Sequence, residues 1–155
     1  MAAVNDADAQ TRLIVATAEA TSGRCAAAEV ISTRAIADLR KVLARDVVVV
    51  CPRVSWSGYP IKILNAMAAG RPVIACRSAA GPITDGIDGL TIPDDDAPAL
   101  ADAILRLRHD RALREYLGTA ARETIRTMHR PALLARRIGE IYAAVCEKSG
   151  DRGVA

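Results

Sequence analysis

The segment Ser55–Ala75, SWSGYPIKILNAMAAGRPVIA, constrains the fold most, because it predicts a turn, a buried helix and a buried strand in succession. Gly58 and Pro60 open the helix, since proline is tolerated in the first turn, where its missing N–H is not needed. Gly70 closes the helix, and Pro72 prevents its continuation. The helix is apolar almost all round, which is typical of a helix that is buried rather than half exposed.

Lys62 and Asn65 are the polar residues of this helix, and a spacing of three places them on one face. They lie near the helix N-terminus, where backbone N–H groups and the positive end of the helix dipole favour an anion. The segment therefore indicates a seat for a phosphate group. Two alternatives remain open: Lys62 reaches into solvent along its stem, and Asn65 is a hydrogen-bonded amide of the core.

Short strands rich in β-branched residues alternate with helical patterns along the chain. The strands are predicted at Leu13–Ala16, Glu29–Ser32, Val47–Cys51, Pro72–Cys76 and Leu90–Ile92. The further helices are predicted at Ile36–Arg45, Ala97–Leu107, Arg111–Gly118 and Arg130–Cys146. This alternation predicts an α/β fold with a doubly wound, mostly parallel, Rossmann-like sheet, whose ligands bind at the carboxyl ends of the strands. The apolar run Val47–Val50 is expected to be central and covered on both faces.

The composition argues against several classes of protein. Aromatic residues make up 3% of the 155 residues, which disfavours a nucleic-acid module built on base stacking. No apolar run approaches the roughly 20 residues of a membrane span. The first ten residues are polar and acidic rather than a signal peptide, so a cytoplasmic location is expected.

No metal site is expected either. The four cysteines lack a CxxC spacing, and Cys51 and Cys76, each at the end of a predicted strand, are expected in the core. Asp94–Asp96 looks like a metal cluster, but turn chemistry and helix capping by Asp96 explain it better.

Beyond these patterns, the chain resembles glycosyltransferase family 4, in the donor-binding second domain of the GT-B fold. The family pattern is Glu, seven residues, Glu, followed by a small-residue helix end and a strand of the kind RPVIA. Here the same frame is Ser57, GYPIKIL, Asn65, AMAAGRPVIA, and the resemblance continues through ITDGIDGLTIPDDD to cover roughly Glu29–Val145. It implies one GT-B half with C-terminal helices: an irregular segment with one strand over 1–28, a Rossmann-like domain over 29–147 and a disordered tail over 148–155.

The resemblance implies that a nucleoside-diphosphate sugar binds at this segment. The backbone N–H groups of Gly58, Tyr59 and Ile61 would approach the diphosphate, with Lys62 as a further ligand candidate. Gly81, in the turn SAAGPIT, would let the backbone come close to the donor sugar. No catalytic residue, metal or other cofactor is implied.

Both acidic positions of the family pattern are neutral in this chain. Ser57 stands in place of the Glu associated with the donor sugar, and Asn65 in place of the Glu that binds the ribose hydroxyls. Because a charged hydrogen bond is about twice as strong as a neutral one, reduced donor affinity or catalytic power is expected.

Two parts of a GT-B enzyme have no counterpart in the sequence: the acceptor-binding domain, and an upstream piece of the donor domain with an Arg and Lys pair. In the strand order 3-2-1-4-5-6, that piece includes a central strand. Leu13–Ala16 either takes its place or is the next strand, with its following helix cut short.

Two functions follow from these expectations. The first is the donor-binding domain of a glycosyltransferase, completed by a separate acceptor-binding domain or chain. The second is a non-catalytic nucleotide-sugar-binding or assembly module of the same fold.

Overall fold

The structure is a computed structural model that describes residues 11–17, 28–55 and 58–150. Its strands are β1 (Leu13–Thr17), β2 (Ala28–Ser32), β3 (Val49–Cys51), β4 (Val73–Cys76) and β5 (Leu90–Ile92). Its helices are α2 (Ile36–Leu43), α3 (Ile61–Ala68), α4 (Ala97–His109), α5 (Arg111–Met128) and α6 (Pro131–Gly150), with a short 3-10 turn at Arg77–Ala79. The α/β class predicted from the sequence is confirmed.

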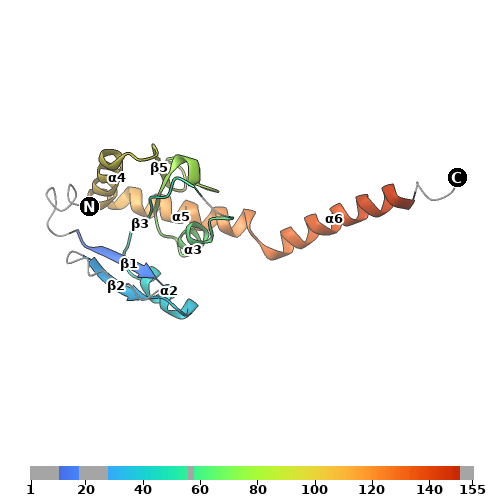
Figure 1. Cartoon of the computed structure of the whole chain (residues 1–155), viewed down its shortest axis with the longest axis horizontal. Coiled ribbons are helices and arrows are strands. Elements are labelled where there is room, and N and C mark those ends of the chain that lie inside the picture. Colours follow the sequence, from blue (N-terminus) through green and yellow to red (C-terminus); the bar gives the residue numbers. More distant parts are fainter. Residues whose placement is uncertain (1–10, 18–27, 56–57, 151–155) are drawn as a thin grey trace.

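The described strands all pair in parallel, but they form two sheets rather than one. β1 pairs with β2 alone, and the second sheet has the order β3-β4-β5. In Figure 1, β1 lies between β2 and the three-stranded sheet.

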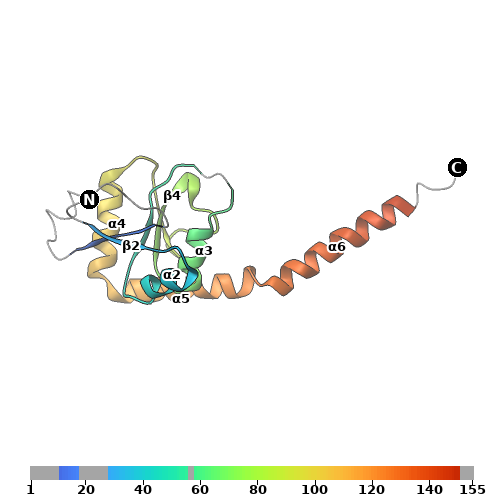
Figure 2. The same cartoon turned by 60° about the horizontal axis from the view of Figure 1, so that its bottom comes forward.

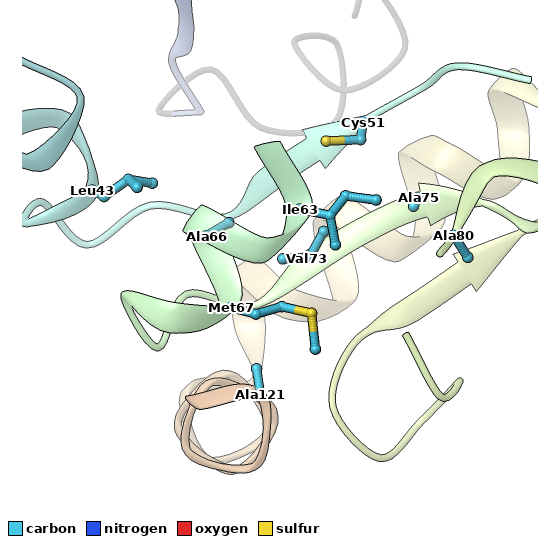
Figure 3. Packing of buried hydrophobic residues seen from close by; sticks show 9 residues of the cluster. All are labelled: Leu43, Cys51, Ile63, Ala66, Met67, Val73, Ala75, Ala80 and Ala121. Atoms are coloured by element: carbon cyan, nitrogen blue, oxygen red, sulfur yellow. The ribbon is translucent and has the colours of Figure 1, made fainter. Parts of the chain in front are cut away.

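The three-stranded sheet is covered on both faces. Alternate residues of β4 enter two clusters: Ile74 and Cys76 pack with α4, and Val73 and Ala75 pack with α3. Figure 3 shows the second cluster, with the Met67 side chain of α3 directed toward α5. Every residue of β4 is buried, so this strand is the centre of the core.

The expectation that Val47–Val50 would be central is wrong, because β3 is an edge strand that pairs with β4 on one side only. Val48 and Val50 pack against the first cluster and Val49 against the second, so both faces of the run are in contact with the core, although its residues are half-buried. A run of apolar residues thus lies at a sheet edge.

α5 continues to Met128 instead of ending at Gly118, where its end was predicted. A Cβ at Gly118 would collide with the carbonyl oxygen of Gly70, in the turn after α3. The glycine therefore allows two segments to pack closely, and it does not mark a helix end.

α6 extends away from the rest of the chain in both views (Figures 1 and 2). Its predicted apolar stripe is present, but the four side chains are 45–63% exposed: Leu134, Ile138, Ile141 and Val145. The helix runs to Gly150, and the remainder of the expected tail lies outside the described residues. Among the described residues, no helix is both long and apolar enough to cross a membrane.

Candidate functional site

The carboxyl ends of β3, β4 and β5 are tied together by Ser78. Its hydroxyl donates a hydrogen bond to the Val54 carbonyl at 2.7 Å, and its backbone N–H donates to Oδ1 of Asp94 at 3.2 Å. Val54 follows β3, Ser78 follows β4 and Asp94 follows β5. The three loops therefore meet at the edge where ligands bind in parallel α/β sheets.

α3 begins at this same edge. Pro60 is buried and occupies the N-cap position, one residue before the first turn where it was expected. The N–H groups of Ile63 and Leu64 donate to its carbonyl at 3.0 and 3.2 Å. The Ile61 N–H, one of the groups expected to face a diphosphate, donates to the Tyr59 carbonyl at 2.8 Å and so already has an acceptor within the chain.

Two glycines of the candidate site differ in what surrounds them. Gly58 is exposed with φ +104°, and a Cβ there would meet open space. Gly81 has φ +61°, and a Cβ there would collide with the Pro60 ring. The turn that contains Gly81 thus packs on the start of α3, which brings together two segments that the sequence analysis had assigned to the same site.

A ring contact that no sequence pattern predicted lies at this edge. The Tyr59 side chain is 60% exposed, and its ring centroid lies 6.2 Å from that of His129, with the planes inclined by 54°. His129 caps the C-terminus of α5, and nothing in its local sequence connects it with the turn. Only the packing of α5 along α3 brings it there.

Cys51 and Cys76 end β3 and β4 and are buried, as predicted. Burial raises the pKa of the Cys51 thiol, and the positive charge of the exposed Lys62 side chain partly opposes this shift. Burial also raises the pKa of Cys76, with Asp94 acting in the same direction. Both thiols are therefore stabilised in the neutral form, and Lys62 brings positive charge to this edge.

Asn65 lies away from the turn, although it shares a helix with it. Its half-buried side chain lines an open cavity of about 500 Å³ between α2 and α3. The cavity is also lined by Ile36, Leu39, Arg40, Leu43, Ala44, Ala68, Ala69, Arg71 and Arg122. Because Ala69 and Arg71 precede β4, the cavity lies toward the amino edge of the sheet.

The predicted site residues are thus distributed over two places. The structure brings Tyr59, Ile61 and Gly81 to the carboxyl edge and puts Asn65 on the α2–α3 cavity. Ser57 lies outside the described residues.

Asp96 and Asp88 have structural hydrogen-bond partners. Asp96 accepts the Ala99 N–H at 2.8 Å as the N-cap of α4, as predicted. Asp88, which the sequence analysis did not single out, is 2% exposed and accepts the Thr84 N–H at 2.7 Å and the Thr124 hydroxyl at 2.8 Å. Within the described part of the chain, no three His, Cys, Asp or Glu residues are grouped so that they could hold a metal ion.

A family model described as "Glycosyl transferases group 1" matches residues 1–110. The chain is similar to an exopolysaccharide phosphotransferase of Streptomyces coelicolor, with 39% identity over 83 residues, which are 52% of this chain and 9% of that protein. It is also similar to a phosphatidyl-myo-inositol mannosyltransferase of Mycobacterium leprae, with 32% identity over 106 residues, 67% of this chain and 28% of the relative. The chain thus spans less than a third of either curated relative.

A solved structure shares the fold. The Anabaena protein HepE, determined in complex with UDP-glucose, superposes with a TM-score of 0.73 at 17% sequence identity. The match covers 93% of this chain and 45% of that chain. The Rossmann-like architecture expected for a GT-B half is therefore confirmed.

Proposed function

Because the chain belongs to the group 1 glycosyl transferases, we propose that it binds a nucleoside-diphosphate sugar as the donor-binding domain of a family-4-type, retaining glycosyltransferase. The proposed reaction transfers the sugar to an acceptor held by a separate domain or chain, in the cytoplasm. The observation that carries the proposal is the meeting of three strand ends at Ser78, directly beside the start of α3. HepE, of similar fold, was determined with UDP-glucose, which supports this class of ligand.

The proposed phosphate contacts come from the start of α3. We assign the backbone N–H groups of Gly58 and Tyr59 and the ammonium group of Lys62 to the diphosphate. The exposed Lys62 side chain and the open space around Gly58 support this assignment. Ile61 is a weaker candidate for a phosphate contact, since its N–H already donates to the Tyr59 carbonyl.

The proposed sugar contacts come from three further residues. Gly81 and Ser57 are assigned to the donor sugar, and Asn65 to the ribose. Asn65 can both donate and accept hydrogen bonds, and its half-buried position on the α2–α3 cavity leaves part of its surface exposed. The Pro60–Gly81 contact also gives Gly81 a packing role that needs no ligand.

A second candidate function is a non-catalytic module that binds nucleotide sugars or assembles with a partner. Neutral Ser57 and Asn65 at the two acidic positions favour it. The Streptomyces relative, named for phosphotransfer, contains a matching segment that makes up 9% of its length, so related sequence also occurs in a protein named for different chemistry.

Donor binding is tested by thermal-shift titration of the chain with UDP-glucose, UDP, GDP-mannose and ADP-glucose. A ligand at 100 times its Kd should stabilise the fold by about 2.7 kcal/mol. We expect one nucleotide to raise the midpoint, and Lys62→Ala and Asn65→Ala each to weaken binding. Lys41→Ala is the matched control, because Lys41 is an exposed lysine on α2.

The titration has two informative results. A shift that the site variants reduce and Lys41→Ala preserves would support the donor site. A folded chain that responds to none of the nucleotides would contradict it. If a donor binds, release of free sugar or transfer in the presence of an acceptor domain would then favour the enzyme over the module.

A further inference from the structure

The α2–α3 cavity combines positive charge with an aliphatic lining. Arg40, Arg71 and Arg122 line it, and none of the lining residues is acidic. Asn65 is the remaining polar residue of the lining, and the others are all aliphatic. The cavity volume of about 500 Å³ lies in the range of small-molecule sites, roughly 300–1,000 Å³. In size and charge, the cavity therefore suits a small anionic ligand.

The guanidinium group of Arg71 is not satisfied within the described part of the chain. Arg71 is half-buried in the turn between α3 and β4, and its Nε is buried without a hydrogen-bond partner among the described residues. Its backbone N–H, by contrast, donates to the Ala66 carbonyl at 3.0 Å. A buried N–H of a charged group costs free energy unless it donates to an acceptor. An anion in the cavity that Arg71 lines would supply that acceptor.

A second guanidinium group lies at the same turn. Arg122 of α5 donates through Nη2 to the Ala69 carbonyl at 2.9 Å, at the C-terminus of α3. A Cβ on Gly70 would lie 2.8 Å from this Nη2, so the guanidinium group lies directly against the glycine. Helix capping explains this one bond, but a guanidinium group has five N–H donors. The turn thus carries two arginines that can donate to one ligand.

The charge of these arginines is not cancelled by neighbouring carboxylates. Asp38 and Glu123 are the acidic residues nearest in sequence to Arg40 and Arg122, and they are paired with other residues, Lys41 and Arg126. The cavity therefore keeps a positive charge that favours an anion.

The aliphatic part of the lining indicates what else the ligand contains. Leu39 and Leu43 come from α2, and Ala68 and Ala69 come from the end of α3. A bare anion would leave these side chains in contact with water, whereas an apolar body would cover them and gain affinity. The ligand is therefore expected to be amphiphilic.

We infer that the α2–α3 cavity binds a phosphate monoester that carries a short aliphatic body. Guanidinium groups bind phosphate oxygens through paired, charge-assisted hydrogen bonds. A phosphate monoester carries close to two negative charges at neutral pH, which match three arginines better than the single charge of a carboxylate does. The phosphate group contacts Arg71 and Arg122, and the aliphatic body lies along Leu39 and Leu43.

This site is separate from the proposed diphosphate contacts. Those contacts come from the start of α3, whereas the arginines lie beyond its C-terminus, toward the amino edge of the sheet. Asn65 is the residue common to both places. The inference rests on the arginines and does not depend on donor binding.

Hexyl phosphate is the probe for the test, and its binding to the full chain is measured by isothermal titration calorimetry. Inorganic phosphate and hexanol serve as probes of the charged half and the apolar half alone. We expect hexyl phosphate to bind about tenfold or more tightly than inorganic phosphate, because each buried CH₂ group contributes to affinity. The Arg71 Nε–Hε signal in NMR spectra should shift on saturation, because this group gains an acceptor.

Arg71→Gln and Arg122→Gln should each weaken hexyl phosphate binding about tenfold or more, because charge-assisted hydrogen bonds are lost. Ala68→Glu should abolish binding, because it places a carboxylate in the cavity from an exposed helix position that tolerates a side chain. Arg136→Gln is the matched control, since it removes the same charge from an exposed arginine of α6, which extends away from the cavity (Figures 1 and 2). Circular dichroism shows whether each variant folds.

Vesicles identify the source of the phosphate group. Binding to phosphatidylcholine vesicles that contain phosphatidic acid, reduced by Arg71→Gln, would indicate a lipid phosphate. Binding of hexyl phosphate without binding to these vesicles would indicate a soluble ester.

The absence of saturable hexyl phosphate binding would overturn the inference. So would equal affinities of the unmodified chain, Arg71→Gln and Arg122→Gln, or a hexyl phosphate affinity no higher than that of inorganic phosphate. Competition between UDP-glucose and hexyl phosphate would also overturn it, because the cavity would then be part of the donor site. Donor binding can fail while hexyl phosphate binds, so the two proposals are tested separately.

Discussion

β4 and β1 are both short apolar strands, yet their surroundings differ completely. Each of the four residues of β4 is buried, whereas the five residues of β1 are half-buried or exposed. β4 has a strand on either side and helices on both faces, while β1 has one partner among the strands of the described residues. Apolar composition therefore makes a segment suitable for a core, but its neighbours determine how much of it is removed from water.

The two C-terminal helices show the same difference. α5 contributes buried Leu117 and Ala121 to the two clusters of the three-stranded sheet. α6 has an apolar stripe of comparable character, but it projects from the body of the molecule and stays exposed (Figure 2). Stability is thus expected to reside in β3–β5 and α3–α5.

The largest expected effect is at Leu117, which is fully buried. Leu117→Ala should destabilise the chain by about 2–5 kcal/mol, through lost burial and a residual cavity. Leu134→Ala, the same change at a residue 60% exposed on α6, should cost less than about 0.5 kcal/mol. Urea unfolding of both variants measures the difference, and equal losses would show that α6 is covered in solution.

A smaller effect on stability is expected when a glycine is replaced by alanine, and its sign should be opposite in α5 and α6. Gly118→Ala should cost about 1–3 kcal/mol, because the added methyl group meets the Gly70 carbonyl. Gly139→Ala on α6 meets open space and should stabilise the helix by up to about 1 kcal/mol. Thermal unfolding compares the two. A stabilising Gly118→Ala would mean that α5 and the turn after α3 are not in close contact.

The smallest effect concerns the link between β2 and the end of α2. Arg45 donates two hydrogen bonds, both of 3.1 Å, to Glu29, and they lower the pKa of that carboxyl below its ordinary 4.5. A lowered folded-state pKa means that the contribution to stability is present above the ordinary value and is lost as pH falls through the folded-state pKa. Because both side chains are exposed, the contribution is expected to be small.

Arg45→Gln should return the pKa of Glu29 toward 4.5, as followed by NMR titration of the side chain. Glu123, whose pKa is lowered by Arg126, should keep its titration curve in this variant and serves as the control. An unchanged Glu29 curve would show that the Arg45 contact is not populated.

Local features of the fold were predictable from the sequence. The helix cap at Asp96 and the strand positions depend on residues adjacent in the chain, and the structure has them close to where the patterns indicate. The start of α3, with Gly58 and Pro60 before it, was predictable for the same reason. The turn half of the candidate site could therefore be located from sequence.

Other features depended on contacts between residues far apart in the chain. The sequence by itself determined which segments become helices and strands, because backbone propensity, capping and periodicity act over a few residues. The tertiary structure alone decided that the sheet is divided, that Gly118 lies inside a helix, and that His129 reaches Tyr59. It also decided that Gly81 packs against the Pro60 ring and that Asn65 lines a separate cavity. Pairing, burial and close approach depend on which surfaces meet in three dimensions, and no local pattern carries that information.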